Sequence, residues 1–234
     1  SENTNKLLKD AMEDDFAPSE TLNAISQKES NNLKKPANTL LNVLNDMDHS
    51  YNNLLLPYLV YEDKNMFLEG YATFKNQKLY GYLDYPTSLA VDLFRNNLRT
   101  CPLELSPNLN VELNNIQVTP HVNLKGQKLS VNLNVKADST VKEASDAIDV
   151  FSQDTLSKIN ALEKYKLMEN LRKLMQLSKK EHLDLLDVGA TLEKQAGQTQ
   201  LEKNWETYIE NLDISLSVQS ATAKTYTIES GRTK

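Results

Sequence analysis

The chain has 234 residues and a formal net charge of −6, and 39% of its residues are hydrophobic while 25% are charged. This composition is typical of a globular domain with a polar surface. The acidic balance excludes an electrostatic argument for nucleic-acid binding, which needs a basic patch. The single cysteine excludes an intrachain disulfide. No stretch approaches the ~20 consecutive apolar residues of a membrane-spanning helix.

The first 64 residues show short helical patterns with few large apolar side chains. The apolar run Leu54–Tyr61 contains Pro57, which predicts an edge strand or an extended connector because proline cannot donate a hydrogen bond to a strand ladder. We expect residues 1–64 to be the C-terminal part of a preceding domain that is truncated here. Residues 65–234 are then expected to form a domain of their own.

Residues Met66–Asp84 predict a β-hairpin with a two-residue turn at Asn76–Gln77. Polarity alternates with the period of two that a half-buried strand pair requires, and asparagine at the first turn position tolerates positive φ. The predicted pairs on one face are Phe74 with Leu79, Ala72 with Gly81, and Gly70 with Leu83. Those on the other face are Thr73 with Tyr80, Tyr71 with Tyr82, and Glu69 with Asp84.

Two features of this hairpin are candidates for a specific role. Gly70 and Gly81 lack a Cβ, so we expect close approach of another segment there and destabilisation by valine at either position. Tyr71, Tyr80 and Tyr82 share the second face. They are interpreted either as packing residues under a neighbouring element or as a surface for a partner protein.

Further along the chain, a helix is predicted to open at Pro86–Thr87. Two long strands follow, one from Val111 to Leu124 with irregularities at Asn114–Asn115 and Pro120, and one that alternates strictly from Leu129 to Ala137.

Helical periodicity then runs from Val141 to Leu183 and from Gly189 to Asn211. Trp205, in the second stretch, is expected to be a structural core residue. The predicted apolar stripe of the long helix is Ile159, Leu162, Tyr165, Met168, Leu171 and Leu174. A closing strand at Leu212–Val218 completes an α+β fold, with a mostly antiparallel sheet packed by a long amphipathic helix and shorter helices, preceded by a small partly helical segment.

Residues that could carry chemistry are scattered. His49, His121 and His182 show no metal-ligand spacing, and Cys101 has no neighbouring CxxC pattern or helix start that would lower its pKa, which favours a buried, inert thiol. The acidic run Glu13–Asp15 is interpreted as solvated. The sequence contains no nucleophile elbow, P-loop or dinucleotide fingerprint. We therefore expect no catalytic, cofactor-binding or metal-binding residues, and we expect that the protein is not an enzyme.

The hairpin resembles the start of the C-terminal domain of the spore germination Ger(x)C family, the lipoprotein C subunits of germinant receptors. The resemblance rests on Glu69–Lys75 and Lys78–Asp84. It continues in family order through Cys101–Pro102, Ile116–Pro120, Gly126–Lys128, Val131–Val135, the long helix, Asp187–Gly189, Trp205 and Leu212–Val218. Pro86–Ser88 departs from the acidic residue that often follows the hairpin, and the glycine usual after the last strand has no clear counterpart.

The resemblance implies a non-enzymatic receptor subunit without a cofactor, on the outer face of the spore inner membrane. A lipid anchor upstream of this otherwise soluble fragment would hold it there, and it would act with A and B membrane subunits in nutrient-triggered germination. Two other hypotheses remain. One is an extracytoplasmic ligand-binding or adhesion module unrelated to germination. The other is a hydrolase whose site lies upstream.

Overall fold

A computed structural model of the chain describes residue 33 and residues 54–62, 65–75, 77–144, 152–196 and 204–223. The described strands form two sheets. In the first, the order is β1 (Leu54–Glu62), β2 (Asn65–Lys75), β3 (Lys78–Asp84); in the second, it is β4 (Thr100–Ser106), β5 (Leu109–Lys125), β6 (Lys128–Ala144), β7 (Asp213–Ala223).

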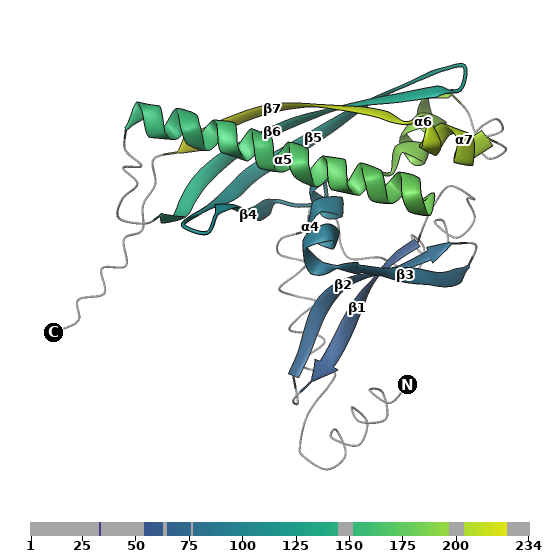
Figure 1. Cartoon of the computed structure of the whole chain (residues 1–234), viewed down its shortest axis with the longest axis horizontal. Helices are drawn as coiled ribbons and strands as arrows, with labels where there is room; N and C mark the ends of the chain where they lie inside the picture. Colours follow the sequence, from purple (N-terminus) through teal and green to yellow (C-terminus); the bar gives the residue numbers. More distant parts are fainter. Residues whose placement is uncertain are drawn as a thin grey trace, which may run out of the picture.

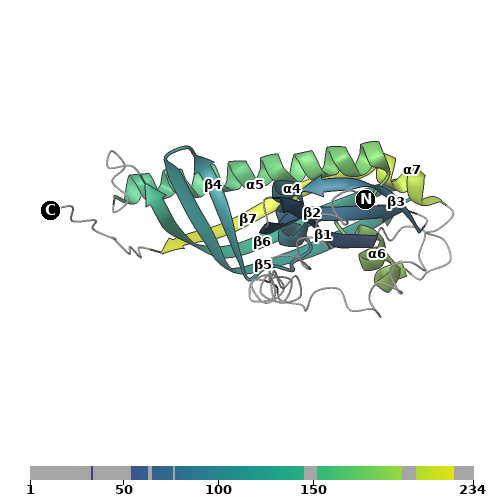
Figure 2. The same ribbon diagram turned by 90° about the horizontal axis from the view of Figure 1, so that it is seen from below.

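The helices join and cover these sheets. They are α4 (Tyr85–Phe94), α5 (Gln153–Glu181), α6 (Val188–Ala196) and α7 (Trp205–Glu210). The long helix α5 runs along the four-stranded sheet, while α4 lies between that part of the molecule and the three-stranded sheet (Figures 1 and 2). The predicted α+β class is confirmed.

The last strand pairs in a way that periodicity did not reveal. β7 is parallel to β6, with Val131 opposite Ile214 and Val135 opposite Val218, whereas every other strand pair is antiparallel. The reason is the connection. Helix α5 carries the chain back along the sheet, so β7 starts at the same end as its neighbour, as a crossover requires.

The predicted register of the β2–β3 hairpin is correct only near the turn. Phe74 pairs with Leu79, but a bulge between Thr73 and Phe74 places Thr73 opposite Gly81 and Tyr71 opposite Leu83. One extra residue moves every later side chain to the other face. Gln77 carries the positive φ of the turn, at 61°, while Asn76 lies outside the described residues.

Gly70 and Gly81 were both expected to permit close approach, and the structure separates them. A Cβ on Gly70 would lie 2.0 Å from the Leu83 carbonyl oxygen, and its φ of 149° disfavours L side chains. A Cβ on Gly81 would meet only the Thr73 Oγ1, at an ordinary 3.7 Å. The expectation is therefore wrong for Gly81.

The segment around the start of the hairpin agrees with its sequence signals. β1 contains Pro57 and is an edge strand, as predicted. β1, before residue 64, pairs with β2, after it, in one sheet. The domain boundary at 64–65 stays a prediction. Helix α4 begins as expected, because the Asp84 carboxylate accepts a hydrogen bond of 2.9 Å from the Thr87 amide and a proline occupies the first turn.

Strand boundaries in the four-stranded sheet needed correction. β4 was not predicted, and β6 continues through Ala144 into sequence that we interpreted as helical. The irregularity at Asn114–Asn115 is confirmed, with a register shift and a φ of 51° at Asn115. Pro120 pairs with Leu133 without a shift, so no irregularity exists there.

Helix α5 buries a different stripe from the one predicted. Leu162 and Tyr165 are 41% and 67% exposed, because a spacing of three residues rotates away from one face of a helix that has 3.6 residues per turn. The buried stripe combines steps of three and of four residues. It consists of Leu156, Ile159, Glu163, Leu167, Leu171, Leu174 and Ser178.

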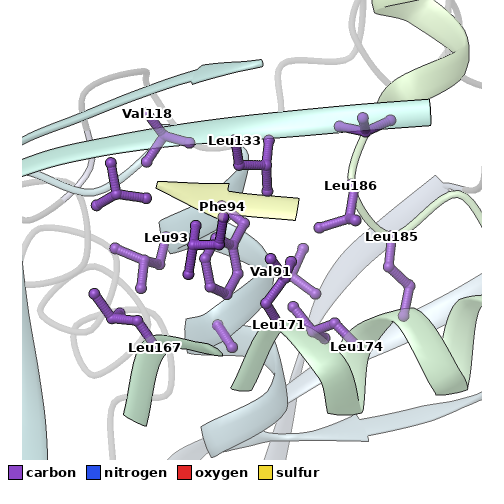
Figure 3. Packing of buried hydrophobic residues seen from close by; sticks show 14 of the residues in the cluster. Val91, Leu93, Phe94, Val118, Leu133, Leu167, Leu171, Leu174, Leu185 and Leu186 are labelled. Atoms are coloured by element: carbon purple, nitrogen blue, oxygen red, sulfur yellow. The ribbon is translucent and has the colours of Figure 1, made fainter. Parts of the chain in front are cut away.

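The core forms where α4 and α5 meet the four-stranded sheet. Val91, Leu93 and Phe94 of α4 are at most 2% exposed. Figure 3 shows them among side chains from the other elements, namely Val118, Leu133, Leu167, Leu171, Leu174, Leu185 and Leu186. Each fully buried aliphatic or aromatic side chain contributes roughly 1.5–3 kcal/mol.

One side chain fixes the end of α4 to the loop after α5. The Arg95 guanidinium donates from Nη2 to the Asp184 carbonyl at 2.6 Å and from Nε to the Leu185 carbonyl at 3.0 Å. The charged guanidinium thus donates to two backbone carbonyls of this loop, and charge-assisted hydrogen bonds of this kind are stronger than neutral ones.

Replacing Gly70 by alanine is expected to lower the free energy of unfolding by about 2 kcal/mol or more, because the backbone must move to relieve the Leu83 contact. The matched substitution Gly81→Ala should change it by less than about 1 kcal/mol. Urea unfolding of both variants measures the difference. Equal effects at the two glycines would contradict the bulged register.

Candidate interaction surface

The three candidate tyrosines do not form one surface. Tyr71 pairs with Leu83, whereas Tyr82 pairs with Ala72, and directly opposed residues of an antiparallel pair share a face. Tyr71 and Tyr82 therefore point to opposite faces of the small sheet. Within the described residues, Tyr71 and Tyr80 each donate a hydrogen bond to a helix residue, and Tyr82 does not.

Tyr71 ties the small sheet to α4. Its hydroxyl donates to Asp92 Oδ2 at 2.6 Å, and the Asn97 amide donates to the other oxygen of the same carboxylate at 3.1 Å. Burial raises the pKa of Asp92, and these two hydrogen bonds oppose the shift. Tyr71 is half-buried, so its role in the structure is packing and anchoring.

Tyr80 makes a second link, at the surface. It lies at the bulge of β3, is 49% exposed, and donates to Glu181 Oε2 at the end of α5 at 2.9 Å. Lys180 Nζ lies 2.8 Å from the same carboxylate group. Hydrogen bonds from Lys180 and Tyr80 lower the pKa of Glu181. Tyr80 therefore joins β3 to α5.

Tyr82 belongs to an aromatic pair on the opposite face. It is 60% exposed, and its ring centroid lies 4.8 Å from that of Tyr58, with planes tilted by 55°. These residues stand on β1 and β3, the two strands that flank β2. The small side chain of Ala72 between them leaves room for the rings to meet.

This face continues along the whole sheet. Phe67 pairs with Val60, which lies two residues from Tyr58 on β1. Leu79 pairs with Phe74, which lies two residues from Ala72 on β2. Because side chains two residues apart on a strand point to the same side, Phe67 and Leu79 share the face of Tyr58 and Tyr82. Phe67 is 52% and Leu79 51% exposed. We call the face that carries Tyr58, Phe67, Leu79 and Tyr82 the aromatic face. Sequence reasoning missed Tyr58 and Phe67. The period of two along β1 places Leu56, Tyr58 and Val60 on one face, and this was the signal for Tyr58.

Residues with potential catalytic or metal-binding chemistry lie apart in the structure. Cys101 is 3% exposed, as predicted, and burial raises its pKa to about 12. His121 is exposed on β5 and His182 follows the end of α5, while His49 and Glu13–Asp15 lie outside the described residues. Within the described ranges, no three His, Cys, Asp or Glu side chains gather into a metal site.

A shallow recess of about 350 Å³ lies on the four-stranded sheet at the bulge in β5. Its lining consists of Asn115, Gln117, Lys136, Ala137, Asp138, Gln219 and Ser220. The Asn115 amide donates to Asp138 Oδ2 at 2.7 Å. The lining offers side-chain amides, one hydroxyl group and one charged side chain of each sign, Lys136 and Asp138, and it contains no histidine or cysteine.

The sequence segment Asp187–Gly189 begins helix α6, and a buried carboxylate caps it. Asp184 accepts hydrogen bonds from the Val188 and Gly189 amides at 2.9 and 2.7 Å. Burial, followed by the charge of Asp187, raises the pKa of Asp184 to about 6. Trp205 is 5% exposed at the start of α7 and packs in the main core.

Glu163 is a second buried carboxyl group. It is 0% exposed on the sheet-facing side of α5. Burial raises its pKa, and the nearby hydroxyls of Ser139 and Ser220 oppose the shift, although neither carboxyl oxygen has a hydrogen-bond partner in the described part of the chain. Nearby, the Ser139 hydroxyl contacts Thr222 Oγ1 at 3.0 Å, so the carboxyl group lies at a small polar island between α5 and the strands β6 and β7.

Comparisons with known proteins identify the relatives of this fold. The family model described as spore germination B3/GerAC-like, C-terminal, matches residues 69–225. The chain belongs to this family. A search of the curated proteins finds no match.

A solved structure titled "Crystal Structure of the GerBC protein" is similar to this GerAC-like chain, with a TM-score of 0.68 and 13% sequence identity. The match covers 81% of this chain and 61% of that one, so the likeness shows the fold. Among the described helices of this family member, none combines the length and apolarity needed to cross a membrane.

For this GerAC-like chain, Tyr71→Phe is expected to lower the free energy of unfolding by about 1–2 kcal/mol, because the partly buried Asp92 carboxylate loses a hydrogen-bond donor. Tyr82→Phe, which removes an exposed hydroxyl, should stay within about 0.5 kcal/mol. Chemical denaturation of the two variants tests this division. A larger loss at Tyr82 than at Tyr71 would contradict it.

Glu163→Gln is expected to remove a pH dependence of stability. Because burial raises the pKa of Glu163 above 4.5, the folded state binds more protons than the unfolded state in the window above that value. The wild type should therefore lose stability relative to the variant as pH rises through the raised pKa. Urea unfolding of both proteins between pH 4 and 8 measures their free energies of unfolding, and a difference between them that does not change with pH would refute the assignment.

Proposed function

We propose that this chain is the folded C-terminal part of a non-enzymatic C subunit of a spore germinant receptor, acting in receptor assembly and nutrient-triggered germination. The observation that carries the proposal is the family match over residues 69–225, which spans most of the β2–β3 hairpin, the whole four-stranded sheet and all four described helices. The similarity in fold to the GerBC protein supports it.

The proposed partners are the A and B membrane subunits of the same receptor. The full-length protein would be attached by an N-terminal lipid anchor to the outer face of the spore inner membrane. A single acyl chain binds a bilayer only marginally, so contacts with other subunits would be needed for stable attachment. Residues 1–64 would then belong to the end of a preceding domain between the anchor and the GerAC-like domain.

The proposed activity is binding and assembly, without a cofactor. Two observations support it. The one cysteine is buried with a raised pKa, and the described histidines and carboxylates do not converge. The exposed aromatic face, by contrast, is the kind of surface that protein partners bind.

Deleting the full-length gene is expected to abolish germination in response to one nutrient, or one set of nutrients, while responses to others persist. A loss of absorbance in spore suspensions exposed to a nutrient panel measures this selectivity. Complementation with the intact gene is the control. Unchanged germination for every nutrient would contradict a role as a receptor subunit and would favour a ligand-binding or adhesion module unrelated to germination.

A further inference from the structure

The aromatic face carries a strip of exposed apolar side chains that the buried Ala72 interrupts. Its members Phe67, Leu79 and Tyr82 are 51–60% exposed, although they come from both ends and the middle of the small sheet. Single exposed apolar residues are common on proteins, but several large ones on one sheet face indicate an interaction site. The other face of the same sheet contacts α4 instead.

The dimensions of the strip suit a polypeptide. Phe67 and Phe74 of β2 pair with Val60 and Leu54 of β1, which lie six residues apart, and at ~3.3 Å per residue this gives about 20 Å. The tilted Tyr58–Tyr82 pair stands near the middle, with centroids 4.8 Å apart. A strip of this length matches an extended segment of about seven residues, or about four turns of a helix.

Negative charge borders the strip. Glu62 and Asp84 share the aromatic face by strand alternation, since they follow Val60 and Tyr82 by two residues, and Glu69 is exposed at the bulge of β2. None of the three carboxylates forms an ion pair with a residue that the structure describes. Gly70, which follows Glu69, pairs with both Tyr58 and Asp84, so the two carboxylates lie beside Tyr58. Burial and then the charges of Glu69, Tyr82 and Asp84 raise the pKa of Tyr58.

Exposed aromatic rings next to carboxylates that form no ion pair with a described residue make a site for a cationic side chain. A lysine or arginine placed over the face of Tyr82 gains a cation–π interaction and reaches the carboxylates of Glu69 or Asp84. Apolar neighbours in the same segment would cover Phe67 and Leu79. A surface of anionic lipids does not fit, because the acidic border repels it.

We propose that the aromatic face is the docking surface for a segment of one of the receptor's membrane subunits in which a lysine or arginine stands between apolar residues. This inference rests on the proposed function. It adds the surface used and the chemistry of the bound segment.

The test uses the full-length protein co-expressed with the A and B subunits of its receptor and purified in detergent through a tag on one of them. Phe67→Ala with Tyr82→Ala is expected to reduce the co-purified C subunit at least tenfold, as for truncation of central aromatic anchors. The matched control is Tyr165→Ala, which removes a tyrosine that is 67% exposed on α5, away from the small sheet.

Charge reversal tests the cationic part of the segment separately. Glu62→Lys with Glu69→Lys should also reduce co-purification at least tenfold, and wild-type binding should weaken with rising salt. The control is Glu104→Lys, an exposed carboxylate on β4. An unchanged yield with the reversed charges would overturn the assignment of a basic segment.

The remaining outcomes separate this inference from the proposed function. If the wild-type protein does not co-purify with either subunit, the proposed function fails. If it does, and the aromatic variants co-purify equally, the docking surface is wrong. Three results with the isolated chain would also overturn it: a dimer that Tyr82→Ala dissociates, lipid-vesicle binding that the same variant abolishes, or a loss of several degrees in Tm in the aromatic variants, which would indicate internal packing.

Discussion

The burial of α4 between the two sheets is the contact on which the rest of this structure depends. Val91, Leu93 and Phe94 fill the space beneath α5 and the four-stranded sheet, while Tyr71 of the small sheet donates to Asp92 on the same helix. Arg95 then fixes the end of α4 to the loop that starts α6. A ten-residue helix thus sets the position of the small sheet relative to the main domain.

This arrangement divides the small sheet by function. The face toward α4 carries Tyr71 and the buried Thr73, which is 1% exposed, and it contributes to stability. The opposite face keeps Phe67 and Tyr82 exposed, where each leaves a large apolar surface in water unless a partner covers it. The bulge at Thr73–Phe74 creates the division, since it sends Tyr71 and Tyr82 to opposite sides.

Two polar groups show a different constraint. Glu163 and Asp184 are both buried, at 0% and 2% exposure, but their surroundings differ. Asp184 receives two backbone amides at the start of α6, so its carboxylate contributes directly to capping a helix. Glu163 meets hydroxyl groups on β6 and β7, and its burial links stability to pH. Neither group lies on the aromatic face, so their substitution leaves the proposed docking surface intact.

The sequence by itself determined the α+β class, the hairpin turn near Phe74 and Leu79, the start of α4 and the alternation of β6, because these depend on local periodicity and on capping residues. It also carried the family resemblance, which the family match over residues 69–225 confirmed. Only the tertiary structure decided the bulges, the parallel pairing of β7 and the true buried stripe of α5. These depend on which distant segment supplies the contact, and Gly70 illustrates the reason: its lack of a Cβ matters because the Leu83 carbonyl, on another strand, occupies that space.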